Sequence, residues 1–364
     1  MRLKDICSYL DTAIPISFQE DYDNSGLQTG YPEKEITKGL LAVDVTEQIV
    51  DEAIAESADI IISHHPVVFR GLKKLTGDTV TERILLKSVR NEIAIYSAHT
   101  NLDMIAGGVS KKMADKLGLQ NVKVLVPLKN RLLKLVTFIP EAHLSTVSDA
   151  VFNAGAGVIG NYDRCSFSLP GTGTFRPGEG TKPFTGVPGE MHFEKEVRFE
   201  TIMFDHLKHD VIKALLAAHP YEEVAYDIYP LENDNIEIGL GCSGEFSDPV
   251  TEEKFLEMLS QVFGAKGIRY SGPTGRLIRK AALCGGAGAS LLKDAIGAGA
   301  DAFVTADIKY HTFFEAENRI LLVDCGHYES EKNSTEIIYD LIIKKFPTFA
   351  LRFSKSNTNP INYH

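Results

Sequence analysis

Apolar runs and amphipathic stretches alternate along the first hundred residues of the chain. Short apolar runs over residues 38–44, 59–63 and 93–98 predict strands, whereas residues 47–57 and 79–91 predict helices. Strands that alternate with helices in this way are typical of a parallel sheet covered by helices.

The same alternation returns after position 275 and predicts a second α/β lobe. There we expect strands over residues 279–284, 302–305 and 319–323, and helices over residues 289–298 and 311–318. The run from Ala58 to His65 resembles the run from Ala300 to Asp307, and each follows a comparable helix. The similarity fits two related lobes that face each other, but it is short enough to arise by chance.

The middle of the chain follows a different order. It predicts a strand, a helix, further strands, a helix and a last strand, with a Gly/Pro-rich loop or hairpin over residues 169–190. This order is typical of a ferredoxin-like α+β domain. The elements are strands over residues 132–139, 196–203 and 223–230 and helices over residues 144–154 and 205–218. We therefore expect a discontinuous α/β core, residues 1–125 and 246–364, and an inserted domain, residues 126–245.

Two adjacent histidines, His64 and His65, follow one of the predicted buried strands. Ligands of open α/β sheets bind where the carboxyl ends of strands meet their loops. Imidazole is a common ligand of zinc and iron, and burying two adjacent imidazoles without partners is costly. The pair therefore indicates a metal site.

Two further strand ends offer side chains of the same kind. One predicted strand runs into His99 and Asp103. Another passes through Gly326, which permits a sharp turn, into His327 and Glu331, which are four apart and share a helix face. The combined donors suit two metal ions close together, and two of them are carboxylates that can bridge. The predicted ligands are His64, His65, Asp103, His327 and Glu331.

Each of these residues also has an explanation that involves no metal. A single histidine near a strand end is most often a hydrogen-bonded turn residue. His327 and Glu331 can form a solvated pair on an exposed helix. The coincidence at three strand ends favours the metal site.

The composition is that of an acidic chain with enough apolar residues for a substantial core. Its 364 residues are 44% hydrophobic and carry a net charge of −11, which argues against binding nucleic acid through phosphate neutralisation. The five cysteines form no CxxC pair and indicate neither a disulfide framework nor a cysteine zinc site. The N-terminal residues lack the apolar core of a signal peptide, and no segment is long and apolar enough to span a membrane. We therefore expect a cytoplasmic protein that does not bind membranes.

Two other motifs have both a functional and a structural interpretation. The glycine-rich turn from Gly285 to Ala289 lies between a strand and a helix, and either cradles a nucleotide phosphate or allows tight packing. The polar segment from His219 to Glu223 suggests a second site, but a helix end that leads into a strand explains it equally well.

Several motifs, in this order and spacing, resemble those of the Nif-three-like family, whose members are usually labelled GTP cyclohydrolase I type 2 homologues. The resemblance extends from about residue 20 to residue 360. Two positions depart from the family pattern, because Ala306 replaces a common glycine and Ala287 a common serine. The motifs are Asp23 to Gly30, Ser63 to Pro66, Thr100 to Asp103, His219 to Glu223, Cys284 to Gly288, Thr305 to Lys309, Gly326 and His327 with Glu331, and Asn357 to Pro360.

The resemblance implies two Nif-three-like α/β lobes with parallel-rich sheets and a dinuclear metal centre. It also implies a toroidal homohexamer and, in the longer bacterial members, an inserted domain similar to the PII-like fold. The family's metal ligands fall on the five residues selected above.

Two metal ions, either zinc or iron, predict a hydrolase that acts on a small molecule such as a purine nucleotide. For GTP, water would attack C8 of guanine, and formate would be lost. His99, Asp307 and His311 are the candidate catalytic acids or bases, although His99 can instead orient a ligand. The alternative is a non-catalytic assembly that handles metal or senses a partner through the inserted domain.

Overall fold

The computed structural model describes residues 1–233 and 235–364, and the chain divides into two compact units. The larger unit combines Met1–Pro127 with Ile236–His364, and the smaller unit is Leu128–Asn235. The smaller unit is shorter at both ends than the insert expected from sequence. Two long strands that the sequence analysis did not predict, β5 (Gln120–Leu128) and β10 (Asn235–Val250), occupy the difference.

The first sheet of the larger unit is mostly parallel. Its strands, in spatial order, are β1 (Gly26–Thr29), β4 (Ala94–Ser97), β3 (Ile60–Ser63), β2 (Lys38–Ala42) and β15 (Ala350–Phe353). Only β1, at one edge, pairs antiparallel. Every residue of β3 and β4 is buried, which is the pattern of strands covered on both faces.

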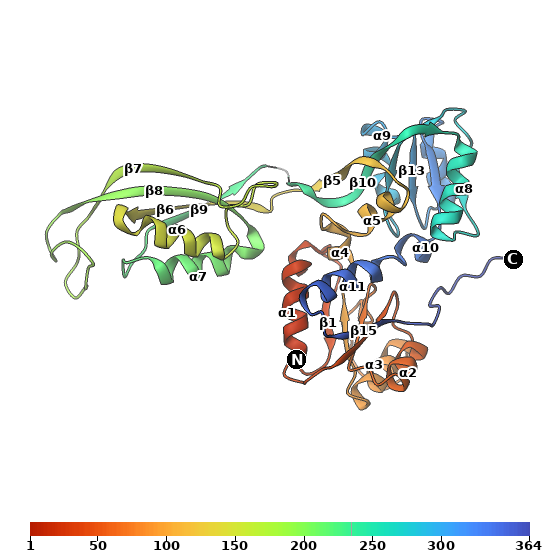
Figure 1. Cartoon of the computed structure of the whole chain (residues 1–364), viewed down its shortest axis with the longest axis horizontal. Helices are drawn as coiled ribbons and strands as arrows, with labels where there is room; N and C mark the ends of the chain where they lie inside the picture. The colour runs from red at the N-terminus through yellow and green to blue at the C-terminus, as the bar shows by residue number, and fades with distance from the viewer. Residues whose placement is uncertain (234) are drawn as a thin grey trace. The chain divides into compact units, whose positions relative to one another are not determined.

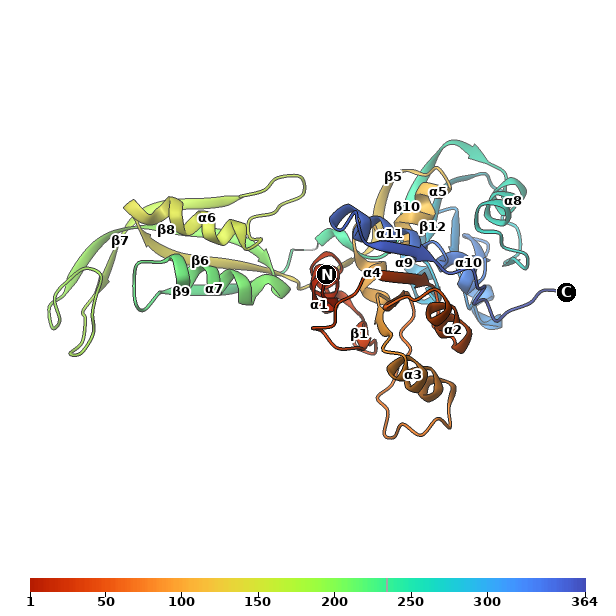
Figure 2. The same ribbon diagram turned by 60° about the horizontal axis from the view of Figure 1, so that its bottom comes forward.

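The two helices predicted in this lobe, over residues 47–57 and 79–91, form close to those positions as α2 and α3. Figure 2 shows α2 and α3 next to each other, and the two helices are in contact. Thr46 and Thr79 cap these two helices, since each side chain accepts a hydrogen bond from the backbone three residues on. The helices are α1 (Leu3–Ala13), α2 (Glu47–Ala55), α3 (Val80–Arg90), α4 (Thr100–Met104), α5 (Val109–Lys116) and α11 (Ser334–Lys345), with a 3-10 turn at Ile16–Phe18.

The second sheet of the larger unit has a parallel centre and antiparallel edges. Its spatial order is β11 (Arg269–Tyr270), β14 (Leu321–Asp324), β13 (Ala302–Thr305), β12 (Ile278–Leu283), β10 and β5. Strands β12, β13 and β14 are parallel, as predicted. The accompanying elements are α8 (Glu252–Phe263), a 3-10 turn at Ala289–Leu291, α9 (Leu292–Gly297), a 3-10 helix at Tyr310–Ala316 and α10 (His327–Glu331).

The helix predicted over residues 311–318 forms as a 3-10 helix, Tyr310–Ala316, rather than as an α-helix. The segment contains Thr312, Phe313 and Phe314, which are β-branched or aromatic and have low helix propensity. Glu317 and Asn318 then adopt left-handed backbone angles, which end the helix.

One apolar cluster joins the two sheets of the larger unit. Ile60 and Ile62 of β3 and Val304 of β13 pack in it together with apolar residues of α1, α5, α8 and α11. Figure 1 shows α4, α5, α10 and α11 lying between the two sheets. Burying each isoleucine contributes about 1.5–3 kcal/mol, so the two lobes form a single folded body.

The α-helices of the described residues are short. The longest α-helices of the described residues, α8 and α11, have 12 residues each. No helix in the described part of the chain combines the length and apolar character needed to cross a bilayer.

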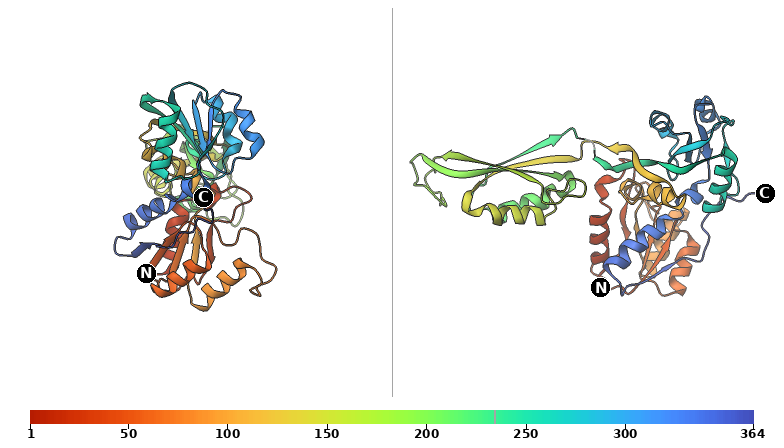
Figure 3. Two further views of the ribbon diagram at one scale, coloured as in Figure 1. Left: turned by 90° about the vertical axis from the view of Figure 1, so that its right-hand side faces the viewer. Right: turned by 45° about the horizontal axis from the view of Figure 1, so that its top comes forward.

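The smaller unit is a four-stranded antiparallel sheet with two helices on one face. The spatial order is β7 (Ser166–Phe175), β8 (His192–Phe204), β6 (Leu132–Pro140) and β9 (Tyr226–Leu231). Helices α6 (Leu144–Asn153) and α7 (Lys208–Ala218) pack side by side against it, each preceded by a 3-10 turn, at Glu141–His143 and Asp205–Leu207 (Figure 3). Strand, helix, two strands, helix and strand therefore follow one another in the predicted order.

The Gly/Pro-rich stretch over residues 169–190 is only partly a loop. Its first part, through Phe175, belongs to β7, although it contains Pro170, Gly171 and Gly173. β7 is an edge strand, where a proline disrupts no second ladder and glycines are tolerated.

Candidate metal centre

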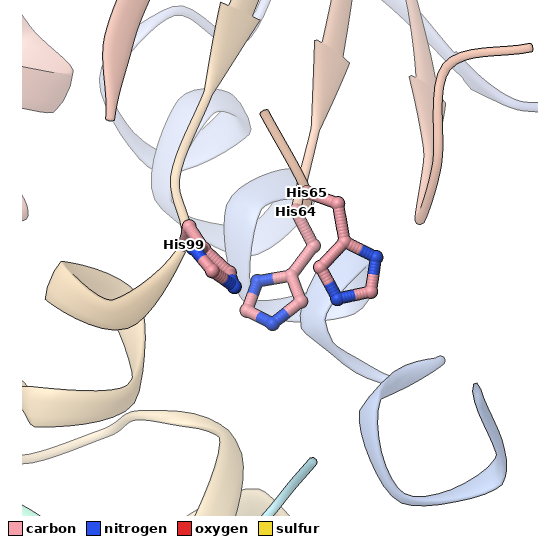
Figure 4. Close-up of side chains that lie close together, drawn as sticks. All are labelled: His64, His65 and His99. Atoms are coloured by element: carbon pink, nitrogen blue, oxygen red, sulfur yellow. The ribbon is translucent and has the colours of Figure 1, made fainter. Parts of the chain in front are cut away.

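The carboxyl end of β3 positions His64 and His65. The backbone N–H groups of both residues donate to Val43 O, at 3.2 and 2.9 Å, which fixes them beside the end of β2. The His64 side chain is fully buried, and that of His65 is partly exposed. Figure 4 shows these two rings and that of His99 gathered at the strand ends. One nitrogen from each of the three imidazoles lies within 4.8 Å of the others.

The end of β4 positions His99 and Asp103. Asp23 accepts hydrogen bonds from the Thr100 backbone N–H, at 3.0 Å, and from the Thr100 hydroxyl. These bonds hold the start of α4. Asp103 therefore lies one helical turn after the strand end rather than on an extended loop, and its Oδ1 is buried.

The end of β14 positions His327 and Glu331. Gly326 has a φ of +95°, so the chain turns sharply from the strand into α10, as the sequence predicts. A Cβ added at Gly286 would lie 2.1 Å from Glu331 Oε1. Gly286 therefore lets the Glu331 carboxylate approach the glycine-rich turn closely.

Glu331 lies at the centre of the cluster. Its Oε2 lies 3.0 Å from His65 Nε2 and 3.0 Å from His327 Nε2, and these two nitrogens are 3.4 Å apart. Its Oε1 lies 3.7 Å from His64 Nε2, which is 4.0 Å from Asp103 Oδ1. The structure thus brings all five predicted ligands together, in two groups of three that share Glu331, and each group could hold a metal ion.

Three atoms of the cluster are buried and make no hydrogen bond of acceptable geometry. They are His64 Nε2, Asp103 Oδ1 and Glu331 Oε2. Two imidazole nitrogens lie 3.0 Å from Glu331 Oε2, but the angles are not those of a hydrogen bond. Atoms that bind a common cation would be arranged in this way. A buried polar atom without a partner costs about 1–3 kcal/mol, and a cation bound among these three atoms would remove that cost.

Each histidine of the cluster has a second interaction on its Nδ1 atom. His65 pairs with Asp44 and His327 with Asp307, both at 2.7 Å, and His64 pairs with the Ala98 carbonyl at 2.8 Å. When Nδ1–H donates in this way, the Nε2 lone pair is left to face a metal. Asp44 was missed from the sequence, although it ends the predicted strand beside the His64 strand.

The two buried carboxyl groups have opposite pKa shifts. Burial raises the pKa of Asp103, and the charge of Glu331 raises it further. Burial also acts to raise the pKa of Glu331, but the neighbouring imidazoles, His64 first, lower it well below its ordinary range. The surroundings thus favour the neutral form of Asp103 and the charged form of Glu331.

The two imidazoles nearest Glu331 are held in their protonated form. Burial acts to lower the pKa of His65, but Asp44 and Glu331 raise it to about 10. Burial also acts to lower the pKa of His327, but Glu331 and Asp307 raise it to about 9. A divalent cation would displace these protons, because metal-bound imidazole is neutral.

A cavity of about 590 Å³ opens onto the cluster. His65, His99 and Glu331 line it, together with the rings of Tyr22 and Phe69. Cys284 also lines it, and burial raises the pKa of this thiol.

The glycine-rich turn favours the packing interpretation over a phosphate cradle. The backbone N–H groups of Gly285, Gly286 and Gly288 already donate to the hydroxyls of Ser110, Ser330 and Thr305. A Cβ at Gly288 would lie 2.4 Å from Cys284 Sγ. Amides engaged in this way are not available to a phosphate.

The three candidate catalytic residues lie in different settings. His99 lines the cavity, with Nδ1 held by Asp23 at 2.7 Å. Asp307 lies beside the cluster but pairs with His327 Nδ1, which suits a positioning role. His311 is exposed, and its described ring contacts are with Tyr310 and Phe314 rather than with the cluster.

Known proteins share this fold over its full length. The chain matches the family described as Duf34/NIF3 (NGG1p interacting factor 3) over residues 1–360. The chain belongs to the Duf34/NIF3 family. The resemblance inferred from its motifs is therefore confirmed.

Relatives within the Duf34/NIF3 family carry one recurrent name. A protein of Halalkalibacterium halodurans named GTP cyclohydrolase 1 type 2 homolog is 42% identical over 315 residues, which are 86% of this chain and 85% of the relative. A Bacillus subtilis protein of the same name is 37% identical over 358 residues, covering 96% and 95%. The crystal structure of a Bacillus cereus protein related to NIF3 has a TM-score of 0.88 at 39% identity, covering 100% of this chain and 99% of that one.

Proposed function

We propose that this Duf34/NIF3 protein holds two divalent metal ions and is a metal-dependent hydrolase. The observation that carries the proposal is the sharing of Glu331. His65 and His327 lie on one of its oxygens, and His64 and Asp103 lie on the side of the other. A carboxylate between two groups of donors is suited to bridge two ions.

The donor set favours zinc or iron, since three imidazoles and two carboxylates suit both. When bound, such ions would act as Lewis acids and lower the pKa of a water molecule. The chain's own residues do the rest. Asp44, Asp307 and the Ala98 carbonyl orient the imidazoles, as described above.

We assign the proton-transfer role to His99. Its Nδ1 is held by Asp23, so its other ring nitrogen is free to take or give a proton within the cavity. We assign Asp307 to positioning His327, and we propose no catalytic role for His311.

The cavity favours a flat heterocyclic substrate. The rings of Tyr22 and Phe69 lie 6.1 Å apart, and Phe69 lies 6.2 Å from the His99 ring. Aromatic rings in this arrangement can pack against a purine. The name of the relatives makes GTP the first substrate to assay, with water attacking C8 and formate leaving.

Three further expectations from the resemblance belong to this proposal. We propose that six chains of 40.0 kDa assemble into a ring in the cytoplasm, and that the smaller unit is a ferredoxin-like, PII-like domain. Its strand order and paired helices support the last point. The mass of the assembly in solution, measured by light scattering, tests whether six chains assemble.

The experiment that tests the proposal has two readouts on one sample. Metal per chain is measured by elemental analysis in protein purified without chelators, and formate release from GTP is then measured. We expect about two ions per chain and formate release, both greatly reduced in Glu331→Gln. The matched control is Glu329→Gln, a buried carboxylate on the same helix that accepts a hydrogen bond from Asn359.

The possible results separate the two parts of the proposal. Two ions without formate would contradict GTP hydrolysis and favour either another substrate or an assembly that handles metal. Fewer than one ion per chain in protein that is folded would contradict the dinuclear centre itself.

A further inference from the structure

The smaller unit contains a cavity of its own, of about 790 Å³. It lies on the open face of the sheet, opposite α6 and α7, and its lining comes from β7, β8, the loop over residues 176–185 and residues 221–225. The last of these segments belongs to the polar motif from His219 to Glu223 that the sequence analysis singled out. All its lining residues belong to this unit, and none belongs to the candidate metal centre.

One buried carboxylate faces this cavity. Glu196 of β8 lines it and is only 8% exposed. The Tyr221 hydroxyl donates to its Oε1 at 2.8 Å. No ion pair joins Glu196 to a lysine, arginine or histidine among the described residues, so a negative charge is buried there with one phenol as its described side-chain partner. Burying a charge without an opposite charge is costly.

Strand β7 is shaped to leave room for this carboxylate. Gly171 lies directly across from Glu196 in the β7–β8 ladder. A Cβ at Gly173 would lie 2.0 Å from Glu196 Oε2 and 2.6 Å from its Cδ. The two glycines weaken β7 as a strand. Gly173 leaves the space that the Glu196 carboxylate occupies, because any side chain there would collide with Oε2.

Aromatic rings surround the same space. The Tyr221 ring lies 6.0 Å from that of Phe175 and 6.1 Å from that of Phe184, measured between centroids. Phe184 belongs to the loop over residues 176–185 that lines the cavity, and Phe138 contributes from β6. Faces of aromatic rings carry partial negative charge and attract cations.

The other charged side chains of the lining do not neutralise Glu196. Arg198 is paired with Glu200 at 2.7 Å, and both Arg198 and Arg176 are exposed. Glu222 accepts a hydrogen bond from the Lys182 backbone at 3.0 Å, and Glu223 adds a further negative charge. The cavity thus combines apolar rings with an excess of negative charge.

We propose that this cavity binds a small organic cation, an amine or quaternary ammonium with an apolar body, whose charge pairs with Glu196 and whose body packs among Phe175, Phe184 and Tyr221. A metal ion is a poor fit, because the described residues of the lining include no group of three converging His, Cys, Asp or Glu side chains. A neutral ligand would leave the charge of Glu196 uncompensated.

The test is a titration of the full-length protein, followed by ligand-observed nuclear magnetic resonance. The probes are phenethylammonium and tetramethylammonium, and the neutral comparison is 2-phenylethanol, which has nearly the shape of phenethylammonium. We expect phenethylammonium to bind about tenfold more tightly than 2-phenylethanol. In Glu196→Gln, which keeps the size of the side chain, this preference should fall to less than about twofold.

The matched control is Glu194→Gln. Glu194 lies on the same face of β8, but it pairs with His192 at 2.9 Å and does not line the cavity. This variant loses the same charge and should keep the preference for the cation. A second variant, Phe184→Leu, alters an exposed loop residue, so folding is preserved. It should weaken binding of the cation more than binding of the alcohol.

Three results would overturn the proposal. They are failure of both cations to bind the wild-type protein, equal binding of phenethylammonium and 2-phenylethanol, and an unchanged preference in Glu196→Gln. Circular dichroism of each variant checks that the fold is intact, and Phe184→Leu decides the question if Glu196→Gln fails to fold.

Discussion

The two units each contain a buried glutamate at the edge of a cavity, but the surroundings of the two carboxylates differ. Glu331 in the larger unit lies among three imidazoles and a second carboxylate. Glu196 in the smaller unit lies among aromatic rings and receives one phenol hydrogen bond. Converging nitrogen and oxygen donors suit a metal ion, whereas apolar rings around one charge suit an organic cation. The neighbours of a buried charge, rather than the charge itself, therefore indicate its ligand.

The two sites also differ in how rigidly they are held. The imidazoles of His65, His327 and His64 in the candidate metal centre are held on Nδ1 by Asp44, Asp307 and the Ala98 carbonyl, at 2.7–2.8 Å. Glu196 has one described side-chain partner, and part of its cavity wall is the loop over residues 176–185. A fixed donor set selects ions by geometry, whereas a loop wall adapts to ligands of different shape.

The largest expected effect comes from Glu331→Gln. Because Glu331 is common to both donor groups, the substitution should reduce metal from about two ions per chain to fewer than one, and turnover to the uncatalysed rate. Elemental analysis and the formate assay measure the two effects. Retention of both ions would contradict the bridging role and remove the contrast with Glu196.

His99→Ala should separate chemistry from metal binding. We expect turnover to fall by about 10²–10⁴, the usual contribution of a general acid or base, while metal content is retained. His311→Ala is the control, because His311 is exposed and away from the cluster, and it should change turnover less than about twofold. A loss of metal in His99→Ala would instead make His99 a ligand.

Asp44→Asn should weaken metal binding without removing a ligand. The amide cannot fix the His65 ring as the carboxylate does, and metal affinity should fall about 10- to 100-fold. Competition with a chromogenic chelator measures this affinity. The control is Asp51→Asn, which alters an exposed carboxylate paired with Lys87 and should leave the metal affinity unchanged. Equal metal affinity in the wild type, Asp44→Asn and Asp51→Asn would show that the bond between Asp44 and His65 Nδ1 does not contribute to metal binding.

The smallest effect is a change of stability with pH. The folded-state pKa values of His65 and His327, about 10 and about 9, lie above the ordinary value of 6.5. The stability that these two histidines contribute to the folded, metal-free protein is therefore fully present below pH 6.5. It is lost as the pH rises through 9 to 10.

Metal-loaded protein should not show this loss, because its imidazoles are already neutral. The difference in Tm between the loaded and metal-free forms should then increase from pH 7 to pH 9. Thermal unfolding of both forms at the two pH values measures it. A difference that stays constant or shrinks would mean that these protons are not displaced by metal.

The ligand candidates could be predicted because their signal is local. His64 and His65 follow an apolar run, and His327 and Glu331 share a helix face after a glycine, so each can be found within a few residues of sequence. The alternating strands and helices of both lobes are equally local, and most of their bounds agree with the structure within a few residues.

What the sequence did not reveal depends on contacts between distant segments. Asp44 meets His65 only because β2 pairs with β3 in the register that aligns Ala42 with Ser63. Glu196 meets Tyr221 across 25 positions, in a cavity covered by a loop. The part of β7 from residue 169 on was predicted as loop or hairpin, because its proline and glycines are unfavourable in most strands. Its place at the edge of a sheet is set by tertiary structure.

Anomalous X-ray diffraction from crystals grown with zinc tests the central claim most directly. We predict two anomalous peaks in the larger unit, both within about 2.0–2.2 Å of Glu331 oxygens. One peak should contact His65 and His327, and the other His64 and Asp103. A single peak, or peaks bound by other residues, would contradict the dinuclear centre.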